Sequence, residues 1–286
     1  MRVAVLGSTG RLGSVLCEHL APRHQLLALG RAEMDLADGD SIRRALEHLD
    51  CEVVLNAAAL TSVEACEADA RLAMRVNSAA PGKIALWAAE RGVRMIHFST
   101  DYVFGGQLPG LRSEGDATGP LSAYGRSKLA GERAVLTHPG HLVLRVSWLY
   151  GEGRPSFVDQ MMAMATAGEP LAAIADKWSK PTPLAQLASW VESLMATGHS
   201  GLLHACPAGE PASWHDVAEA IVSELHACGR IAQPVCVRKQ GLADHPAMQA
   251  TRPRHTAMSS ERLACVLGTT LPHWRDALVD YVRRAR

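Results

Sequence analysis

Short apolar runs alternate with helical segments along the first half of this 286-residue chain. The runs lie at residues 2–7, 24–30, 52–58, 93–99 and 141–148. The helical segments between them include residues 11–20, 41–49, 81–92 and 123–136. The third segment opens on Pro81 and closes on Gly92, which are typical start and stop residues of a helix. Because strands that are apolar along their whole length are buried on both faces, the pattern predicts an α/β fold with a doubly wound parallel sheet.

A glycine-rich turn directly follows the first predicted strand. Gly7, Gly10 and Gly13 have the spacing G-x-x-G-x-x-G and open the first predicted helix. Glycines at this place let the backbone approach a pyrophosphate, whose charge the helix N-terminus favours. The turn therefore predicts a Rossmann-type dinucleotide site that includes Gly7, Ser8, Thr9, Gly10, Arg11, Leu12 and Gly13.

The end of the second predicted strand indicates which dinucleotide binds. NAD sites usually have an acidic residue here that accepts hydrogen bonds from the ribose 2′-hydroxyl, whereas this chain has Gly30 followed by Arg31. An arginine can pair with a 2′-phosphate, so the sequence favours NADPH, with NADH as the alternative. Asp35 and Leu36 fall where the adenine rim would lie, or cap the helix that follows.

Tyr124 and Lys128 are four residues apart in a predicted helix, in a chain with only four tyrosines and five lysines. That spacing puts them on one helix face, where an ammonium group would lower the pKa of the phenol and could also reach a ribose. Ser99 and Thr100 end the fourth predicted strand, where a hydroxyl could polarise a carbonyl. The sequence thus predicts an acid/base site at the carboxyl ends of the strands.

Six motifs in order carry a family resemblance: "GSTGRLG", "NAAALTSVEACE", "STDYVFGG", "AYGRSKLAGE", "RVSWLYG" and "KPTPLAQLA". They resemble the dTDP-4-dehydrorhamnose reductase family of extended short-chain dehydrogenase/reductases, from residue 1 to about 187 and more weakly beyond. The resemblance implies hydride transfer from NADPH to the 4-keto group of a nucleoside-diphosphate 4-keto-6-deoxysugar. It implies catalytic roles for Thr100, Tyr124 and Lys128.

The same resemblance assigns residues to the two ligands. Those on the cofactor side, besides the glycine turn, are Ala57, Ala58 and Ala59, to which we add Ser99, Tyr124 and Lys128. Those that face the sugar are Thr61, Val63, Thr100, Asp101, Tyr102 and Trp148. Arg252 is our own candidate for a pyrophosphate contact.

Two segments depart from the family pattern. Ser156 and Phe157 stand where the family usually has Asn-Phe, and residues 176–182 read "DKWSKPT" where it usually reads "DQYGxPT". Both departures fall on the substrate side, so the sugar nucleotide stays open.

We divide the chain into a dinucleotide-binding domain at residues 1–150, to which residues 183–206 return, and a smaller interwoven lobe at residues 151–286 that binds substrate. Two alternatives to a reductase remain. One is a sugar-nucleotide epimerase or dehydratase. The other is a non-catalytic NADP-binding subunit resembling the methionine adenosyltransferase β subunit.

Composition narrows the classes of partner. The 29 basic and 29 acidic residues cancel, which argues against binding to nucleic acid or to a membrane surface. The seven cysteines are scattered and contain no C-x-x-C, so we expect free thiols in a cytoplasmic protein and no metal site. Neither a signal peptide nor a membrane span is predicted, and a homodimer is compatible with the sequence.

Overall fold

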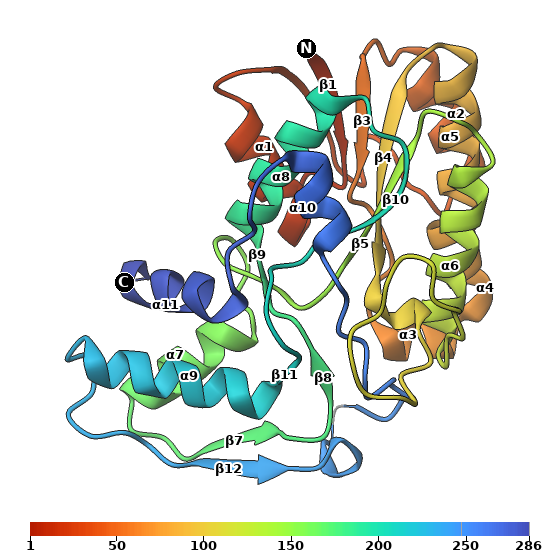
Figure 1. Ribbon diagram of the computed structural model, residues 1–286. Coiled ribbons are helices and arrows are strands. Elements are labelled where there is room, and N and C mark those ends of the chain that lie inside the picture. The colour runs from red at the N-terminus through yellow and green to blue at the C-terminus, as the bar shows by residue number, and fades with distance from the viewer. Residues whose placement is uncertain (247, 286) are drawn as a thin grey trace.

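The centre of the molecule is a six-stranded parallel sheet (Figure 1). The computed structural model describes residues 1–246 and 248–285. The strands are β1 (Arg2–Leu6), β2 (Gln25–Leu29), β3 (Val53–Asn56), β4 (Arg94–Thr100), β5 (Leu142–Val146) and β10 (Gly201–His204). Their order is β10-β5-β4-β3-β1-β2, so the order reverses between β1 and β3. This topology confirms the predicted doubly wound sheet and puts a ligand crevice at the carboxyl ends of β1 and β3.

Helices cover both faces of the sheet (Figure 1). One face packs against α1 (Arg11–Leu20), α8 (Leu184–Thr197) and α10 (Glu261–Leu267). The other packs against α2 (Gly39–Glu47), α5 (Ala80–Glu90) and α6 (Ala123–Leu136). Each layer has its own apolar core, because strands such as β1 alternate their side chains between the two faces.

The helix predicted to begin at Pro81 begins earlier in the structure. A helical stretch runs through α3 (Val63–Ala68), α4 (Ala70–Met74), the π-helical turn η1 (Arg75–Ala79) and α5. Pro81 has no N–H to give to the carbonyl four residues back, and the wider π turn accommodates its ring. The carbonyl of Asn77 is instead approached by Gly131 of α6, where a Cβ would lie 2.1 Å from the carbonyl oxygen. The predicted stop is confirmed, since α5 ends at Glu90 and Gly92 has a φ of 67°.

A second lobe lies below the sheet in Figure 1. Its helices are α7 (Phe157–Thr166), α9 (Trp214–Ala227) and α11 (Trp274–Arg284), and its parallel strands are β7 (Leu171–Ile174) and β12 (Val237–Gln240). A separate apolar cluster, which includes Met161, Ile221 and Trp274, holds these elements together. Serine capping boxes start α7 and α9, so Ser156, one of the departures from the family pattern, is the N-cap of α7.

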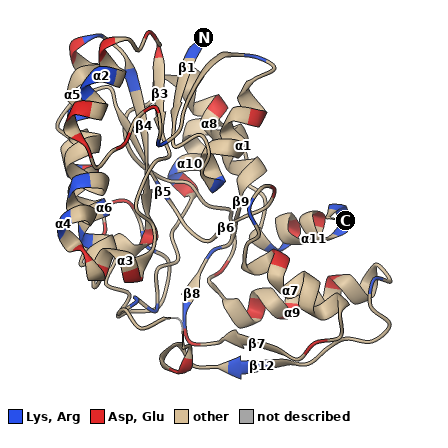
Figure 2. Cartoon of the chain, turned by 180° about the vertical axis from the view of Figure 1, so that it is seen from behind, with Lys and Arg blue, Asp and Glu red and all other residues tan. Residues whose placement is uncertain are grey.

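Short elements connect the two lobes. The strand pairs are β6 (Leu149–Tyr150) with β9 (Thr182–Pro183), and β8 (Trp178–Ser179) with β11 (Ala212–Ser213). The 3₁₀ turns are η2 (Asp101–Val103) and η3 (Leu242–Asp244). Figure 2 shows basic and acidic residues interspersed along the outer helices. None of the helices in the described residues has the length and apolar character needed to cross a membrane.

Candidate active site

The glycine turn forms the tightest backbone contact at the crevice. Gly7 has a φ of 74° and donates its N–H to the carbonyl of Leu29 at 2.8 Å. A Cβ on Gly7 would lie 2.8 Å from the Cα of Ala58, and one on Gly13 would lie 2.0 Å from the carbonyl oxygen of Gly7. The turn therefore needs glycine at both positions. Gly10, the N-cap of α1, has no side chain that would occupy the helix N-terminus, which leaves that terminus able to receive an anion.

A cavity of about 410 Å³ lies beside this turn. Its lining includes nine of the residues predicted on the cofactor side: Gly7, Thr9, Gly10, Arg31, Asp35, Leu36, Ala57, Ala58 and Ala59. The cavity is lined by small and apolar residues and lies next to the N-terminus of α1. These features fit the adenosine and phosphate half of a dinucleotide.

Other residues of the same cavity were missed from the sequence. They are Gly30, Met34, Leu60, Leu72, Val76 and Arg154. Arg154 comes from the loop after β6 and donates to the carbonyl of Thr9 at 3.2 Å, while Arg11 donates to the carbonyl of Arg154 at 2.6 Å. No local pattern predicts this contact, because it joins segments more than 140 residues apart in the sequence.

Arg31 lies at the exposed rim of the cavity. Its side chain is 79% exposed, and its Nε lies 3.5 Å from the carboxylate of Asp35. Asp35 accepts a hydrogen bond from the N–H of Ala37, whereas Asp38 is the N-cap of α2. The alternative that Asp35 or Leu36 caps the following helix is therefore wrong.

The predicted catalytic residues come from two neighbouring elements. Thr100 ends β4, and Tyr124 and Lys128 lie on successive turns of α6, which Ser122 caps by accepting from the N–H of Gly125. A Cβ on Gly125 would lie 2.4 Å from the carbonyl oxygen of Tyr102. A glycine after Tyr124 thus lets the start of α6 pack against η2, the turn that follows β4.

Burial dominates the proton affinity of Tyr124. It raises the pKa of the phenol, and a hydrogen bond with Thr100 is the opposing cause. The ammonium of Lys128 donates to the carbonyl of Phe98 at 2.6 Å and does not contribute to the shift of Tyr124. The expectation that Lys128 lowers the pKa of Tyr124 is therefore wrong, because the net shift is upward and desolvation of the phenolate is its main cause. Burial also lowers the pKa of Lys128 to about 8, against an opposing effect of Glu132.

A buried ion pair links α6 to the central sheet. Arg145 of β5 donates to both carboxylate oxygens of Glu132 at 2.9 and 2.8 Å. The hydroxyl of Ser99, predicted on the cofactor side, donates to Glu132 at 2.5 Å instead of facing the cavity. This pair fixes α6 to the central strands.

Asp101 is buried among hydroxyl groups rather than exposed to a sugar. It is 2% exposed, and one carboxylate oxygen accepts from Ser179 at 2.8 Å and from Thr256 at 2.5 Å. The other oxygen accepts from Thr100 at 3.2 Å. In the structure this carboxylate ties three distant segments together, and its contact with a sugar stays a prediction.

The remaining substrate-side residues fall into two groups. Tyr102 packs edge-on against Tyr124 with ring centroids 5.7 Å apart, and Trp148 packs against Trp214 at 5.4 Å. Thr61 is exposed just before α3, which starts at the buried Val63.

Arg252, from the C-terminal part of the chain, lies beside Tyr102. We call these residues on the predicted substrate side the substrate wall. The guanidinium of Arg252 pairs with Glu64 at 2.7 Å, and its charge opposes the burial that raises the pKa of Tyr102. The structure therefore brings Arg252 beside the predicted catalytic residues.

Lys177 belongs to this wall although the sequence did not single it out as a site residue. Its Nζ lies 4.8 Å from the ring centroid of Tyr102 and 5.3 Å from that of Trp148. The signal that could have found it was the departure at residues 176–182, where lysine replaces the usual glutamine.

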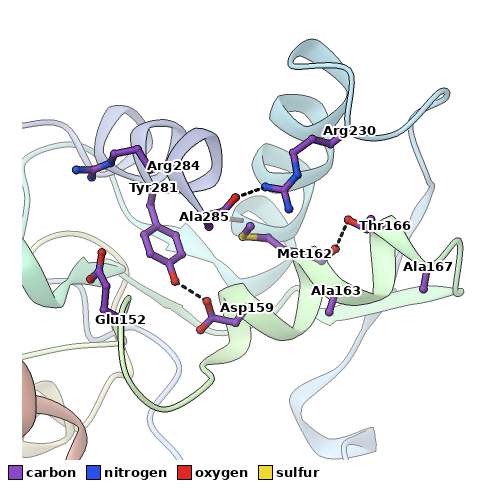
Figure 3. A pocket seen from close by; sticks show the side chains of 10 residues that line it. All are labelled: Glu152, Asp159, Met162, Ala163, Thr166, Ala167, Arg230, Tyr281, Arg284 and Ala285. Atoms are coloured by element: carbon purple, nitrogen blue, oxygen red, sulfur yellow. Dashed lines mark hydrogen bonds between the residues drawn. The ribbon is translucent and has the colours of Figure 1, made fainter.

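Figure 3 shows a hollow of about 760 Å³ that lies apart from these residues. Its walls are α7, α11, the loop after β6 at Glu152 and the turn after α9 at Arg230, and Tyr281 donates to Asp159 across it at 2.6 Å. None of the site residues predicted from the sequence lines it.

Comparisons with known proteins agree over the whole chain. The family described as RmlD substrate binding domain matches residues 1–286. The dTDP-4-dehydrorhamnose reductase of Mycolicibacterium smegmatis is 38% identical over 98% of this chain and 85% of its own length. The enzyme of the same name from Burkholderia thailandensis is 34% identical over 99% of this chain and 98% of its own.

Solved structures show the same architecture. A dTDP-4-dehydrorhamnose reductase from Yersinia enterocolitica superposes with a TM-score of 0.90 at 26% identity, covering 99% of this chain and 98% of its own. One from Bacillus anthracis in complex with NADP has a TM-score of 0.89 at 25% identity, covering 99% of both chains.

Proposed function

Because this chain belongs to the dTDP-4-dehydrorhamnose reductase family, also described as the RmlD substrate binding domain family, we propose that it reduces the 4-keto group of a dTDP-linked 4-keto-6-deoxyhexose with NADPH. The observation that carries the proposal is that Tyr124 interacts with Thr100 at the end of β4 and Lys128 binds the carbonyl of Phe98 in the same strand, at the edge of the sheet where the glycine turn follows β1.

The chain has residues placed to bind each part of the dinucleotide. The glycine turn and the N-terminus of α1 would receive its pyrophosphate, Ala57 to Ala59 would line its adenosine side, and Lys128 would reach its nicotinamide ribose. When bound, NADPH supplies the hydride for the carbonyl carbon.

Tyr124 supplies the proton that completes the reduction. Its raised pKa keeps the phenol protonated at neutral pH, which is the form that donates to the carbonyl oxygen as the hydride arrives. The hydroxyl of Thr100, which donates to Asp101 in the structure, would turn to donate to the same oxygen and stabilise its developing negative charge. Tyr124 regains its proton from solvent, so one hydride and one proton are added for each alcohol formed.

The alternatives are less well supported. A dehydratase needs an acid/base pair near Thr100, and Asp101, the carboxylate next to it, is already engaged by Ser179 and Thr256. A regulatory subunit does not need Tyr124 and Lys128 together on one helix face. An epimerase would recycle its cofactor instead of consuming it.

The purified protein should be mixed with NADPH and dTDP-4-keto-6-deoxyhexose while the absorbance of reduced nicotinamide is followed. We expect one NADPH consumed per sugar nucleotide and a product heavier by two hydrogen atoms in mass spectrometry. No consumption of NADPH, with binding of NADPH verified, would favour the regulatory subunit. Sugar conversion without net consumption would favour the epimerase or dehydratase.

The proposal also covers the domain boundaries, the cellular location and the oligomeric state of the protein. Residues 1–150 with 183–206 form the cofactor domain, and residues 151–286 otherwise form the substrate lobe; β10 at the edge of the central sheet supports this division. The protein acts as a cytoplasmic homodimer. Light scattering after size exclusion tests the dimer, since a monomer mass overturns it.

A further inference from the structure

Lys177 is a buried cation without a polar partner. The residue is 0% exposed, and among the residues described its Nζ has no hydrogen-bond acceptor. Its ammonium lies over the rings of Tyr102 and Trp148. Buried ammonium groups are normally paired, because desolvation of an isolated charge is costly and contact with aromatic rings offsets only part of it.

The charged groups around Lys177 already have partners of their own. Asp101 accepts from Ser179, Thr256 and Thr100 and from no atom of Lys177. Arg252 is paired with Glu64. Within the described residues, Lys177 is therefore the cation on this wall whose hydrogen-bond donors are still free.

The location of these free donors points to the substrate. Tyr102, which the ammonium touches on its ring, also packs against Tyr124. The ammonium thus lies one aromatic ring away from the proposed proton donor.

We propose that Lys177 is a specificity-determining residue that donates hydrogen bonds to a hydroxyl oxygen of the hexose of the sugar nucleotide. The inference rests on the proposed function and deepens it. It also gives a role to the lysine that stands where the family usually has glutamine, since an ammonium donates stronger, charge-assisted bonds than an amide.

Such a contact depends on pH in a defined direction. Burial lowers the pKa of Lys177 to about 8, Arg252 acts in the same direction, and Asp101 opposes both. Of the other groups that face it, Tyr102 has a raised pKa and stays neutral, and His255 has a lowered pKa and is neutral above pH 7. Hence Lys177 is charged below pH 8, and the hexose contact weakens as pH rises through that value.

Steady-state kinetics at saturating NADPH compares the wild type with Lys177→Met and Lys177→Gln, and with the exposed-lysine control Lys239→Gln. We expect Lys177→Met to raise KM for the keto sugar nucleotide about 10- to 100-fold while kcat changes less than about threefold. Lys177→Gln should raise KM less, because an amide still donates. The control should keep the wild-type KM.

Two further readouts separate a sugar contact from a structural role. Calorimetry in the presence of NADP⁺ should show weaker binding of the reduced dTDP-6-deoxyhexose to Lys177→Met, with binding of dTDP alone unchanged. Wild-type KM should rise above pH 8 by more than that of Lys177→Met, whose remaining pH dependence reflects Lys128.

An unchanged KM in folded variants overturns the inference and leaves the proposed function intact, as does an equal loss of dTDP binding. An inactive wild type instead overturns the proposed function. Should neither Lys177 variant fold, equal affinity of the wild type for dTDP and for the reduced dTDP-6-deoxyhexose overturns the inference, because the hexose then contributes no contact.

Discussion

The two walls of the site are built in different ways. The cofactor wall comes largely from consecutive β-α units, and the glycine turn, Ala57 to Ala59, Thr100 and Tyr124 all lie within the first 124 residues. The substrate wall is assembled from segments far apart in the chain, as when Asp101 binds Ser179 and Thr256. The first wall depends on backbone geometry, and the second depends on buried polar side chains that need one another.

This difference predicts which properties a substitution on each wall should change. Changes on the cofactor wall should alter cofactor binding or chemistry through local geometry, whereas changes on the substrate wall should alter stability and sugar affinity together. The predictions below test that division, beginning with the largest effect.

Replacement of Tyr124 by phenylalanine should lower turnover about 10²- to 10⁴-fold, because only the donated proton is lost. NADPH affinity measured by fluorescence should stay within about twofold of the wild type. Tyr281→Phe is the matched control, since that hydroxyl donates to Asp159 in the hollow of Figure 3 and should not affect turnover. A Tyr124→Phe enzyme with more than half of wild-type turnover, when chemistry is rate-limiting, would disprove the proton-donor role.

Gly7→Ala should cost roughly 2–5 kcal/mol of folding stability and abolish measurable NADPH binding, since strain at positive φ adds to overpacking against Ala58. Gly92→Ala is a control with a similar φ of 67° and open space around the new methyl group. It should cost only about 1–2 kcal/mol and leave NADPH binding intact. Denaturant unfolding and calorimetry measure both quantities. Equal effects of the two substitutions would mean that close approach at the turn is unimportant.

Thr256→Val should lower the free energy of unfolding by about 1–3 kcal/mol, because it removes a donor to the buried carboxylate of Asp101. It should also raise KM for the sugar nucleotide while leaving NADPH affinity unchanged. The exposed Thr166→Val, which loses a hydroxyl bond on α7, should change stability by no more than about 0.5 kcal/mol. If Thr256→Val instead weakens NADPH binding, the two walls are coupled and the comparison fails.

Arg31→Ala should weaken NADPH binding about tenfold and leave NADH binding unchanged, since an exposed guanidinium gives the low end of a charge-assisted contact. Titration of both cofactors measures the ratio, and Arg43→Ala, an exposed arginine on α2 outside the cavity, serves as the control. Equal affinity of the wild type for NADH and NADPH would remove Arg31 from the cofactor site.

Much of the cofactor wall followed from local pattern alone. The apolar runs became β1 to β5, the glycine spacing became the turn before α1, and the four-residue spacing put Tyr124 and Lys128 on one face of α6. These features are encoded within a few residues by strand burial, glycine backbone freedom and helix periodicity.

The tertiary structure decided which way the polar groups face. It turned Ser99 toward Glu132 and gave Asp101 its hydroxyl partners, and it left Lys177 buried with free donors. It also set the pKa of Tyr124 by burial instead of by its helical neighbour. Hydrogen-bond partners 33 to 155 residues apart and the desolvation of a side chain are properties of the packed interior, and no window of the sequence contains them.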